Sequence, residues 1–228
     1  MRVLVTRPME DAQAIAVLLN ERGHETLIAP LLSVRFHDGP ELALYGVQAI
    51  LATSANGVRA LARRSARRDL PLFAVGPQTE EAARAAGFAE VKSADGDATA
   101  LARAAADWAV PGAGAMLHVK GADGDSRLAS LLTGFEVREA VLYDVAAQLL
   151  SSDAVNALRS GLLDAALFFS PRSAQIFRER VQGAGLLVAS LIGVCISRST
   201  AEALAPLEFR EVRIAAKPNQ AALLACLD

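Results

Sequence analysis

The sequence predicts an α/β protein made of two similar domains, each built on a parallel sheet. Three observations lead to this prediction. The chain has 228 residues, more than the ~100 to 150 typical of one domain. Short apolar segments alternate with stretches of helical periodicity, the pattern of parallel sheets covered by helices. The third observation is an internal duplication, which implies that both domains share one architecture.

The duplication is clearest at residues 72–88, where four apolar residues end at a Gly-Pro turn and a helix follows. Adding 121 to each number equates Thr79 with Thr200 and, further along, Phe88 with Phe209. So many matches under a single offset are unexpected by chance in a chain of this length. We therefore interpret the two regions as copies of one strand-turn-helix unit.

The duplication extends toward the N-terminus of each copy. Residues 49–54 match residues 165–170 at an offset of 116, and residues 3–5 match residues 117–119 more loosely at an offset of 114. The drift of the offset implies short insertions or deletions in loops. Each half of the chain therefore contains the same order of strands and helices.

The chain opens with a strand, a helix and a second strand. Residues 3–5 are apolar, Pro8 suits the first turn of a helix, and apolar residues recur at helical spacing until Gly23 ends the helix. Residues 24–28 indicate the second strand, which Pro30 stops. This order is the unit from which parallel sheets are built.

Two further segments alternate apolar and polar residues instead of being continuously apolar. They are residues 31–37 and residues 139–145. Because they occupy equivalent points of the duplicated chain, they could pair with each other as a two-stranded antiparallel ladder. The ladder would be the crossover between the domains, and each domain would be discontinuous in sequence.

The predicted domain bounds follow from this crossover. We expect one domain from residues 1–32 with 147–228, an inserted domain from residues 38–140, and the ladder from residues 33–37 and 141–146.

The remaining elements continue the alternation. In the first copy we expect strands at residues 50–54 and 72–75 and from Val91, and helices at residues 56–68, after the Gly-Pro turn, and at residues 97–108. A strand at residues 116–119 should lead into a turn at residues 120–124 and a helix from about residue 125. In the second copy we expect strands at residues 167–170, 194–197 and 212–215, a capping box from Ser199 to Glu202, and a helix at residues 221–227.

Composition excludes several classes of protein. Lys plus Arg is 23 against 25 for Asp plus Glu, so the net charge of −2 gives no global field that would attract nucleic acid or an anionic membrane. Cys195 and Cys226 match no metal or redox spacing, which favours reduced thiols in a cytoplasm. The first strand starts at once and leaves no room for a signal peptide, and the apolar run at residues 185–196 is too short to span a bilayer. We expect a soluble, cytoplasmic protein.

Candidate ligand contacts gather where strands end. Six strand ends carry hydroxyl groups, glycine or a cation, each at an expected helix N-terminus: Thr6-Arg7-Pro8, Thr53-Ser54-Ala55-Asn56, Gly76-Pro77-Gln78-Thr79, Lys120-Gly121, Ser170-Pro171-Arg172 and Ser197-Arg198-Ser199-Thr200. Open α/β sheets bind ligands at this edge, and helix N-termini suit carboxylates or phosphates. The alternative for each serine or threonine is helix capping alone, worth ~1 kcal/mol.

No dinucleotide-binding fingerprint, Walker loop or metal-binding cluster occurs in the sequence. The histidines at positions 24, 37 and 118 have no neighbouring acid at triad-like spacing, so we interpret them as structural. Five arginines fall on the expected helix at residues 56–68 and could attract an acidic ligand, or could simply form its solvated face: Arg59, Arg63, Arg64, Arg67 and Arg68.

At these strand ends the sequence resembles the uroporphyrinogen-III synthase family along its whole length. The matching pieces are, in order, Val5-Thr6-Arg7-Pro8, Thr53-Ser54-Ala55-Asn56-Gly57-Val58, Ala74-Val75-Gly76-Pro77-Gln78-Thr79, Lys120-Gly121, Val141-Leu142-Tyr143, Phe168-Phe169-Ser170-Pro171 and Ile196-Ser197-Arg198-Ser199-Thr200-Ala201. Each piece is weak by itself, but their order and spacing together are specific.

The resemblance implies two similar α/β domains joined by a two-stranded ladder, with the active site in the cleft between them. It also implies the reaction. A linear hydroxymethylbilane, which carries eight carboxylates, is closed to uroporphyrinogen III with inversion of the last pyrrole ring and loss of water, in tetrapyrrole biosynthesis. This is the chemistry of a carbon–oxygen lyase, and it needs no cofactor and no metal. We expect a monomer, and the resemblance leaves room for handover of substrate from hydroxymethylbilane synthase.

The expected catalytic residue is Tyr143, which matches the family pattern on the second alternating segment. Its phenol could donate a proton to the departing hydroxyl, and the alternative is that it packs beside Val141 and Val145. The expected substrate-binding residues are Thr6, Arg7, Ser54, Gly76, Thr79, Lys120, Gly121, Ser170, Ser199 and Thr200. We expect the turns at residues 76–79 and 199–200 to bind carboxylates through backbone N–H groups and hydroxyls.

Two other functions remain open at this point. A two-lobed binding protein would show the same duplication, although typical solute receptors are exported and this sequence shows no signal. A catalytically silent, synthase-like protein that binds tetrapyrroles or regulates their synthesis is the second. It is suggested by Ser197 and Lys120, where the family usually has glycine and arginine. Isomer analysis of the product formed from hydroxymethylbilane would separate these functions.

Overall fold

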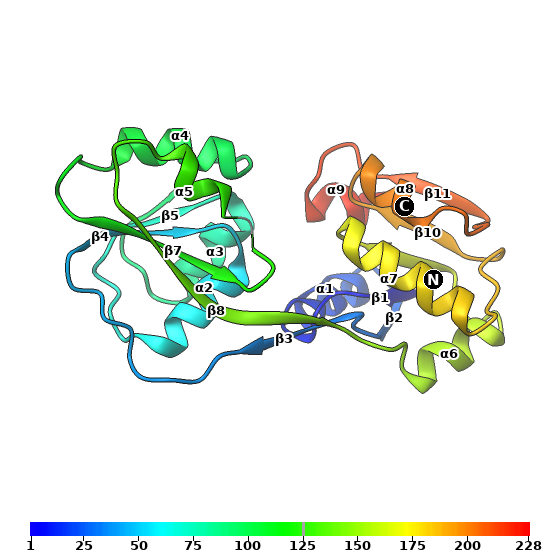
Figure 1. The fold of residues 1–228 in the computed structure, drawn as a ribbon. Coiled ribbons are helices and arrows are strands. Elements are labelled where there is room, and N and C mark those ends of the chain that lie inside the picture. Colours follow the sequence, from blue (N-terminus) through cyan, green and yellow to red (C-terminus); the bar gives the residue numbers. More distant parts are fainter. Residues whose placement is uncertain (125) are drawn as a thin grey trace. The chain divides into compact units, whose positions relative to one another are not determined.

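The computed structural model describes residues 1–124 and 126–228. Contacts divide the chain into two compact units, one formed by Met1–Ser33 with Ala146–Asp228 and the other by Val34–Val145 (Figure 1). Both termini therefore belong to the first unit. None of the helices in the described part of the chain is long and apolar enough to cross a bilayer.

The first unit contains a five-stranded sheet in the order β11-β10-β9-β1-β2, with parallel pairing throughout. Its strands are β1 (Arg2–Val5), β2 (Glu25–Ile28), β9 (Ala165–Phe168), β10 (Ile192–Cys195) and β11 (Glu211–Ile214). Its helices are α1 (Met9–Glu21), α6 (Ser152–Arg159), α7 (Pro171–Gly183), α8 (Arg198–Leu204) and α9 (Gln220–Leu224), followed by a 3₁₀ turn at Ala225–Leu227.

The central strands β9 and β10, and β1 from Val3 onward, are buried on both faces of the sheet, which is why they are continuously apolar. Val3 and Leu167 pack with Ile15 of α1 and Leu223 of α9 on one face. On the other face the Phe168 ring stacks edge-on against Phe177 of α7 at 5.0 Å. The two faces together give the unit a core of its own.

The second unit contains a six-stranded sheet in the order β3-β8-β7-β4-β5-β6. The strands are β3 (Leu32–Phe36), β4 (Val47–Ala52), β5 (Leu72–Ala74), β6 (Val91–Ser93), β7 (Ala115–Gly121) and β8 (Val137–Ala147). The helices are α2 (Ala55–Arg64), α3 (Pro77–Ala85), α4 (Ala98–Trp108) and α5 (Arg127–Leu131). Helices α2 and α3 cover one face and α4 and α5 the other, as their separate apolar clusters show.

The order of strands agrees with an internal duplication. The series β6-β5-β4-β7-β8 in one unit corresponds to β11-β10-β9-β1-β2 in the other. The registers pair Ala165 with Val3 and Ala49 with Met116. Since Ala49 and Ala165 are equivalent, Val3 is equivalent to Met116, so the offset there is 113 and the value of 114 inferred from sequence is wrong by one residue.

The two alternating segments pair with each other as β3 and β8. The His37 N–H donates to the Leu142 carbonyl and the Gln148 N–H donates to the Leu31 carbonyl, both at 2.8 Å. The partners therefore run in opposite directions, and the ladder is antiparallel. The chain passes from one unit to the other twice, each time inside this pair of strands.

A charge cluster flanks the ladder. The Asp144 carboxylate lies 2.8 Å from the Arg35 guanidinium and 2.9 Å from His37 Nε2. The hydrogen bond from Arg35, and then that from His37, lowers the pKa of Asp144 below its usual range. The carboxylate therefore stays ionised to a lower pH than an ordinary aspartate.

The helix expected at residues 56–68 is wrong at its C-terminal end, because α2 stops at Arg64. The Arg64 guanidinium donates instead to the carbonyls of Pro40 and His37. Arg68 donates to the carbonyls of Ala86 and Ser65, both at 2.7 Å. These bonds fix the segment after the helix as an extended chain, so Arg67 and Arg68 are not part of a helical face.

Two other expectations are wrong in detail. Lys120 and Gly121 lie inside β7 and not in a turn, because β8 pairs with β7 as far as Gly121 and Tyr143. The helix α6 was not identified in the sequence, although Ser151 caps it by accepting the Ala154 N–H.

Candidate active site

The hydroxyl of Ser54 and the phenol of Tyr143 meet at the carboxyl end of β4. Ser54 has an extended backbone and caps α2, since its Oγ accepts the Gly57 N–H at 3.2 Å. The same Oγ lies 2.8 Å from the Tyr143 hydroxyl. The structure therefore brings together two of the expected site residues that are 89 positions apart in the chain.

Gly121 makes room for the Tyr143 ring. The two residues are partners in the β7–β8 register. A Cβ added at Gly121 would lie 2.7 Å from Tyr143 Cε2, well inside normal contact. The ring also faces Phe36, with centroids 6.5 Å apart, and Tyr143 is only 8% exposed. Gly121 is therefore a packing surface for the tyrosine in this structure.

Lys120 is paired within the protein. It is only 5% exposed, and its Nζ lies 2.5 Å from Ser126 Oγ and 3.5 Å from Glu139 Oε2. Glu139 also faces His118, with 3.6 Å between Oε1 and Nδ1. The ammonium thus has Glu139 as its counterion in this structure.

His118 has no acid at triad-like spacing along the chain, but the folded sheet places Glu139 beside it. His118 and Glu139 are direct partners in the parallel β7–β8 register. On its other side, His118 Nε2 lies 3.3 Å from Thr53 Oγ1. Spacing along the chain could not reveal this, but pairing the two predicted strands in register would have placed an acid beside the histidine.

The strand end after β5 is shaped by Gly76, which caps α3 with an extended backbone. A Cβ added there would meet nothing within 4 Å, so the space beside this helix N-terminus is open. Thr79 donates its N–H to the Gly76 carbonyl at 3.0 Å, and its side chain is buried. The threonine therefore helps to form the turn.

In the first unit, Thr6 and Arg7 follow β1. The Thr6 hydroxyl is buried and donates to the Leu167 carbonyl at 2.8 Å. The Arg7 guanidinium pairs with Asp11 at 2.5 Å and lies 4.7 Å from the centre of the Phe169 ring. Both residues stand at the same sheet edge as the helix caps after β9 and β10.

Those two caps are serines. Ser170 accepts the Ser173 N–H at 3.1 Å and caps α7. Ser197 accepts the Thr200 N–H at 3.3 Å and lies 3.0 Å from the hydroxyl of Ser199. The predicted capping box that starts at Ser199 is therefore wrong, because the helix begins two residues earlier, at the position equivalent to Gly76. Thr200 is buried and Ser199 is exposed.

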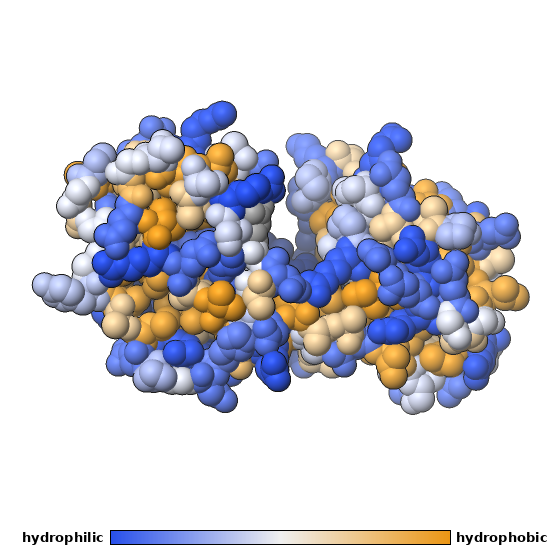
Figure 2. All heavy atoms as spheres, in the orientation of Figure 1, coloured by the Kyte–Doolittle hydropathy of each residue, from blue (hydrophilic) through white to orange (hydrophobic). Residues whose placement is uncertain are grey.

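Three further features bear on the chemistry of the protein: possible metal ligands, the surface pattern and the Cys195 thiol. In the described part of the chain, no group of three or more His, Cys, Asp or Glu side chains is placed to hold a metal. Hydrophilic and apolar residues are interspersed over the visible surface (Figure 2). Burial raises the pKa of the Cys195 thiol to about 12, so this thiol is not an activated nucleophile.

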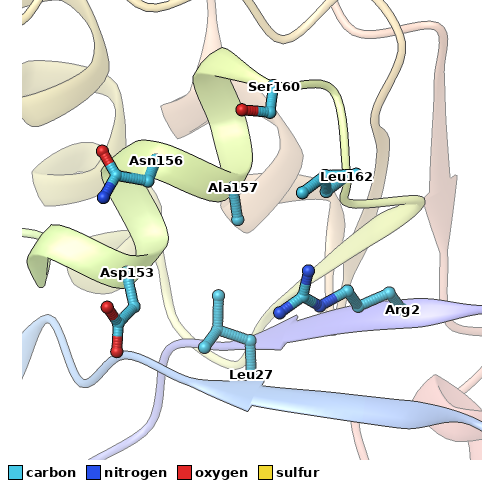
Figure 3. A pocket seen from close by; sticks show the side chains of 7 residues that line it. All are labelled: Arg2, Leu27, Asp153, Asn156, Ala157, Ser160 and Leu162. Atoms are coloured by element: carbon cyan, nitrogen blue, oxygen red, sulfur yellow. The ribbon is translucent and has the colours of Figure 1, made fainter.

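An open hollow lies between α6 and the strands β1 and β2 of the first unit (Figure 3). It includes Arg2, the first residue of β1, together with Asp153 and Asn156 of α6. Arg2 is paired with Glu25 at 3.1 Å. Because the expected site residues follow the carboxyl ends of the strands, this hollow is not part of the candidate site.

Comparison with solved structures supports the fold. The uroporphyrinogen-III synthetase from Helicobacter pylori superposes with a TM-score of 0.66 at 19% identity, covering 100% of this chain and 98% of that one. A mutant uroporphyrinogen III synthase from Thermus thermophilus gives a TM-score of 0.52 at 18% identity, covering 100% of this chain and 97% of that one. At such identities the likeness establishes a shared two-domain α/β fold.

Comparison of the sequence establishes the family. No curated protein matches the chain significantly. The family model described as uroporphyrinogen-III synthase HemD matches residues 13–225, which is nearly the whole chain. The chain therefore belongs to the uroporphyrinogen-III synthase family.

Proposed function

We propose that Tyr143 is the proton donor in the reaction of this family and that helix N-termini at the strand ends hold the substrate's carboxylates. As a member of the family, the protein is a lyase-type enzyme of tetrapyrrole synthesis that acts on hydroxymethylbilane. Because the step that starts ring closure breaks a carbon–oxygen bond and releases water, we assign the enzyme to the carbon–oxygen lyases. We further propose that it works as a cytoplasmic monomer that can receive its substrate from hydroxymethylbilane synthase.

The contact between Ser54 and Tyr143 carries the proposal. Ser54 Oγ already accepts the Gly57 N–H, so its own proton is available for the phenol oxygen 2.8 Å away. With Ser54 as the donor, the phenol proton is directed outward and can be given to a departing hydroxyl. The positive end of α2 lies beside the same oxygen and stabilises the negative charge that proton donation leaves.

A single residue can both donate and take back the proton that the reaction needs. The departing hydroxyl takes one proton and leaves as water. Inversion breaks the bond between the last pyrrole ring and its methylene bridge and forms two new carbon–carbon bonds on that ring, whose free α-carbon loses one proton. Overall the reaction consumes and releases the same number of protons. Tyr143 can therefore give a proton in the first step and regain one after closure.

The carboxylates of the substrate need donors and not a strongly basic protein. We propose that the turn at residues 76–79 and the serine at position 199 bind carboxylates through N–H and hydroxyl groups. The open space beside Gly76 supports this for the first turn. For the second, Ser199 is exposed at the start of α8. We propose supporting contacts from Thr6, Arg7, Ser170 and Thr200, of which Thr6 and Thr200 are buried and would act by shaping the turns.

Substitution of Tyr143 by Phe tests the proposal, since it removes the hydroxyl and keeps the ring. The substrate is generated enzymatically, and the uroporphyrin isomers formed after oxidation are analysed. General acid catalysis is typically worth ~10² to 10⁴ in rate. Because the bilane also ionises unaided, we expect the lower end, a fall of about 10² in formation of the type III isomer, with an unchanged melting temperature.

The chain supplies a matched control. Its other tyrosine, Tyr45, is 93% exposed, so Tyr45→Phe should leave the rate unchanged. If Tyr143→Phe kept full activity, the tyrosine would serve packing alone. If the unmodified protein gave no type III isomer, the assigned activity itself would be wrong.

A further inference from the structure

Thr53, His118 and Glu139 form a polar path across three adjacent strands of the second unit. Thr53 follows β4, His118 lies in β7 and Glu139 in β8. His118 is fully buried, with Nε2 3.3 Å from Thr53 Oγ1 and Nδ1 3.6 Å from Glu139 Oε1. A hydroxyl, an imidazole and a carboxylate therefore follow one another next to Ser54.

The position of Glu139 bears on which ring nitrogen of His118 carries the proton. At 3.6 Å its Oε1 is beyond hydrogen-bond distance of Nδ1 and acts on it through its charge. A carboxylate oxygen that faces Nδ1 attracts an N–H there and repels a bare lone pair. Complete burial opposes a charged ring. Glu139 also faces the Lys120 ammonium at 3.5 Å and accepts from the Ser126 hydroxyl at 3.2 Å, so its charge is already matched. These contacts favour a neutral ring with its proton on Nδ1.

A bare Nε2 makes Thr53 the donor in the contact between them. The Thr53 proton is then directed inward to His118, and only lone pairs remain on the outer side of its oxygen. Thr53 is half-buried, so part of the residue is open to solvent at the strand end. The helix N-termini at the same edge are donors, so Thr53 differs from them in polarity.

We infer that Thr53 is a hydrogen-bond acceptor for the pyrrole N–H groups of the tetrapyrrole and that His118 and Glu139 hold it in this role. The inference rests on the proposed function, because the bilane supplies the pyrrole N–H groups. An oxygen that can only accept gains nothing from a carboxylate, which is also an acceptor. Thr53 thus binds the pyrrole N–H groups of the substrate, and the helix N-termini bind its carboxylates.

The protonation state of His118 tests the inference without any substrate. The chain has three histidines, and ¹⁵N NMR of the imidazole rings near neutral pH shows which nitrogens carry protons. The His118→Gln variant identifies the signals of this ring. We expect a proton on Nδ1 and none on Nε2. A charged ring, or a neutral ring with its proton on Nε2, would make Thr53 an acceptor from His118 and overturn the inference.

Kinetics of Thr53 variants give the second test. Thr53→Val keeps the shape and loses the oxygen, and Thr53→Ser keeps the oxygen. A neutral hydrogen bond is worth ~0.5 to 1.5 kcal/mol, so Thr53→Val should raise KM about 3- to 10-fold with little change in kcat. Thr53→Ser should restore most of the affinity. Equal KM for the valine variant and the unmodified protein would contradict the role of Thr53.

A double-mutant cycle separates His118 from general packing. If His118 acts through Thr53, His118→Gln raises KM in the unmodified background and has no further effect on KM in the Thr53→Val background. Additive effects would mean that His118 acts elsewhere, and would count against the inference. Formation of the type III isomer by the unmodified protein tests the proposed function separately. The NMR result stands even if a Thr53 variant folds poorly.

Discussion

Gly121→Ala should disable Tyr143 without replacing the tyrosine itself. The new Cβ would lie 2.7 Å from Cε2 and 2.9 Å from Cζ of the ring. Carbon atoms pack at ~3.5 to 4.0 Å, so the ring must retreat by about 0.8 Å, the difference between 3.5 and 2.7. A rigid ring carries its hydroxyl along. The 2.8 Å contact with Ser54 then lengthens to as much as about 3.6 Å, which is no longer a hydrogen bond.

Gly121→Ala should lower both the free energy of unfolding and the rate of catalysis. Overpacking of a filled core costs typically ~1 to 3 kcal/mol, and we expect this loss in urea denaturation of Gly121→Ala. Formation of the type III isomer should fall about as far as in Tyr143→Phe, by about 10². In the Tyr143→Phe background the alanine should lower the rate little further, because the hydroxyl it displaces is already absent.

Gly183 provides the matched control, since it ends α7 and a Cβ there would meet nothing within 4 Å. Gly183→Ala should be neutral or stabilise the protein by up to about 1 kcal/mol, because alanine is the better helix former. Unchanged stability and rate in Gly121→Ala would refute the reasoning, since they would mean that the ring has room that the structure does not show.

The other predictions concern stability. Ser197→Ala should cost about 1 kcal/mol in urea denaturation and Ser199→Ala less, because Ser197 caps α8; the reverse order would restore the capping box at Ser199. Burial raises the pKa of Cys195 from 9.0 to about 12, so above pH 9 the unfolded chain loses a proton that the folded chain keeps. Stability should therefore fall between about pH 9 and 12, and less steeply in Cys195→Ala; equal slopes would exclude this cause. Residues 34–145, expressed alone, should unfold cooperatively as an independent domain, and a chain without a sharp transition would contradict the predicted domain division.

The fold could be predicted largely from sequence because the strands are buried on both faces. Residues such as Leu51 and Leu167 lie in short, fully apolar runs, and each run precedes a helix, so the order of elements was readable. The residues at which helices and strands end were harder to predict from the sequence. Helix α2 ends where Arg64 and Arg68 bond to distant carbonyls, and these bonds depend on segments that only the folded chain brings near.

The contacts within the candidate site could not be predicted from the sequence either. Ser54 and Tyr143 were named separately, but their contact depends on the register of β8 against β7. Lys120 was expected in a turn because it follows an apolar run. The strand continues through it, and Glu139 on the neighbouring strand supplies its counterion. Contacts between residues on different strands are fixed by register, which local sequence patterns do not encode.

The interrupted first unit has a consequence for synthesis of the protein. Strand β1 lies inside its sheet, yet Val5 pairs with Leu167, made 162 residues later. At ~5 to 20 residues per second, a ribosome needs about 8 to 30 s to cover that distance. All of Val34–Val145 is synthesised in this interval, during which the edge of β1 that pairs with β9 has no partner. An unpaired edge can pair with other chains. The edge of β1 is therefore open to aggregation until β9 has been synthesised.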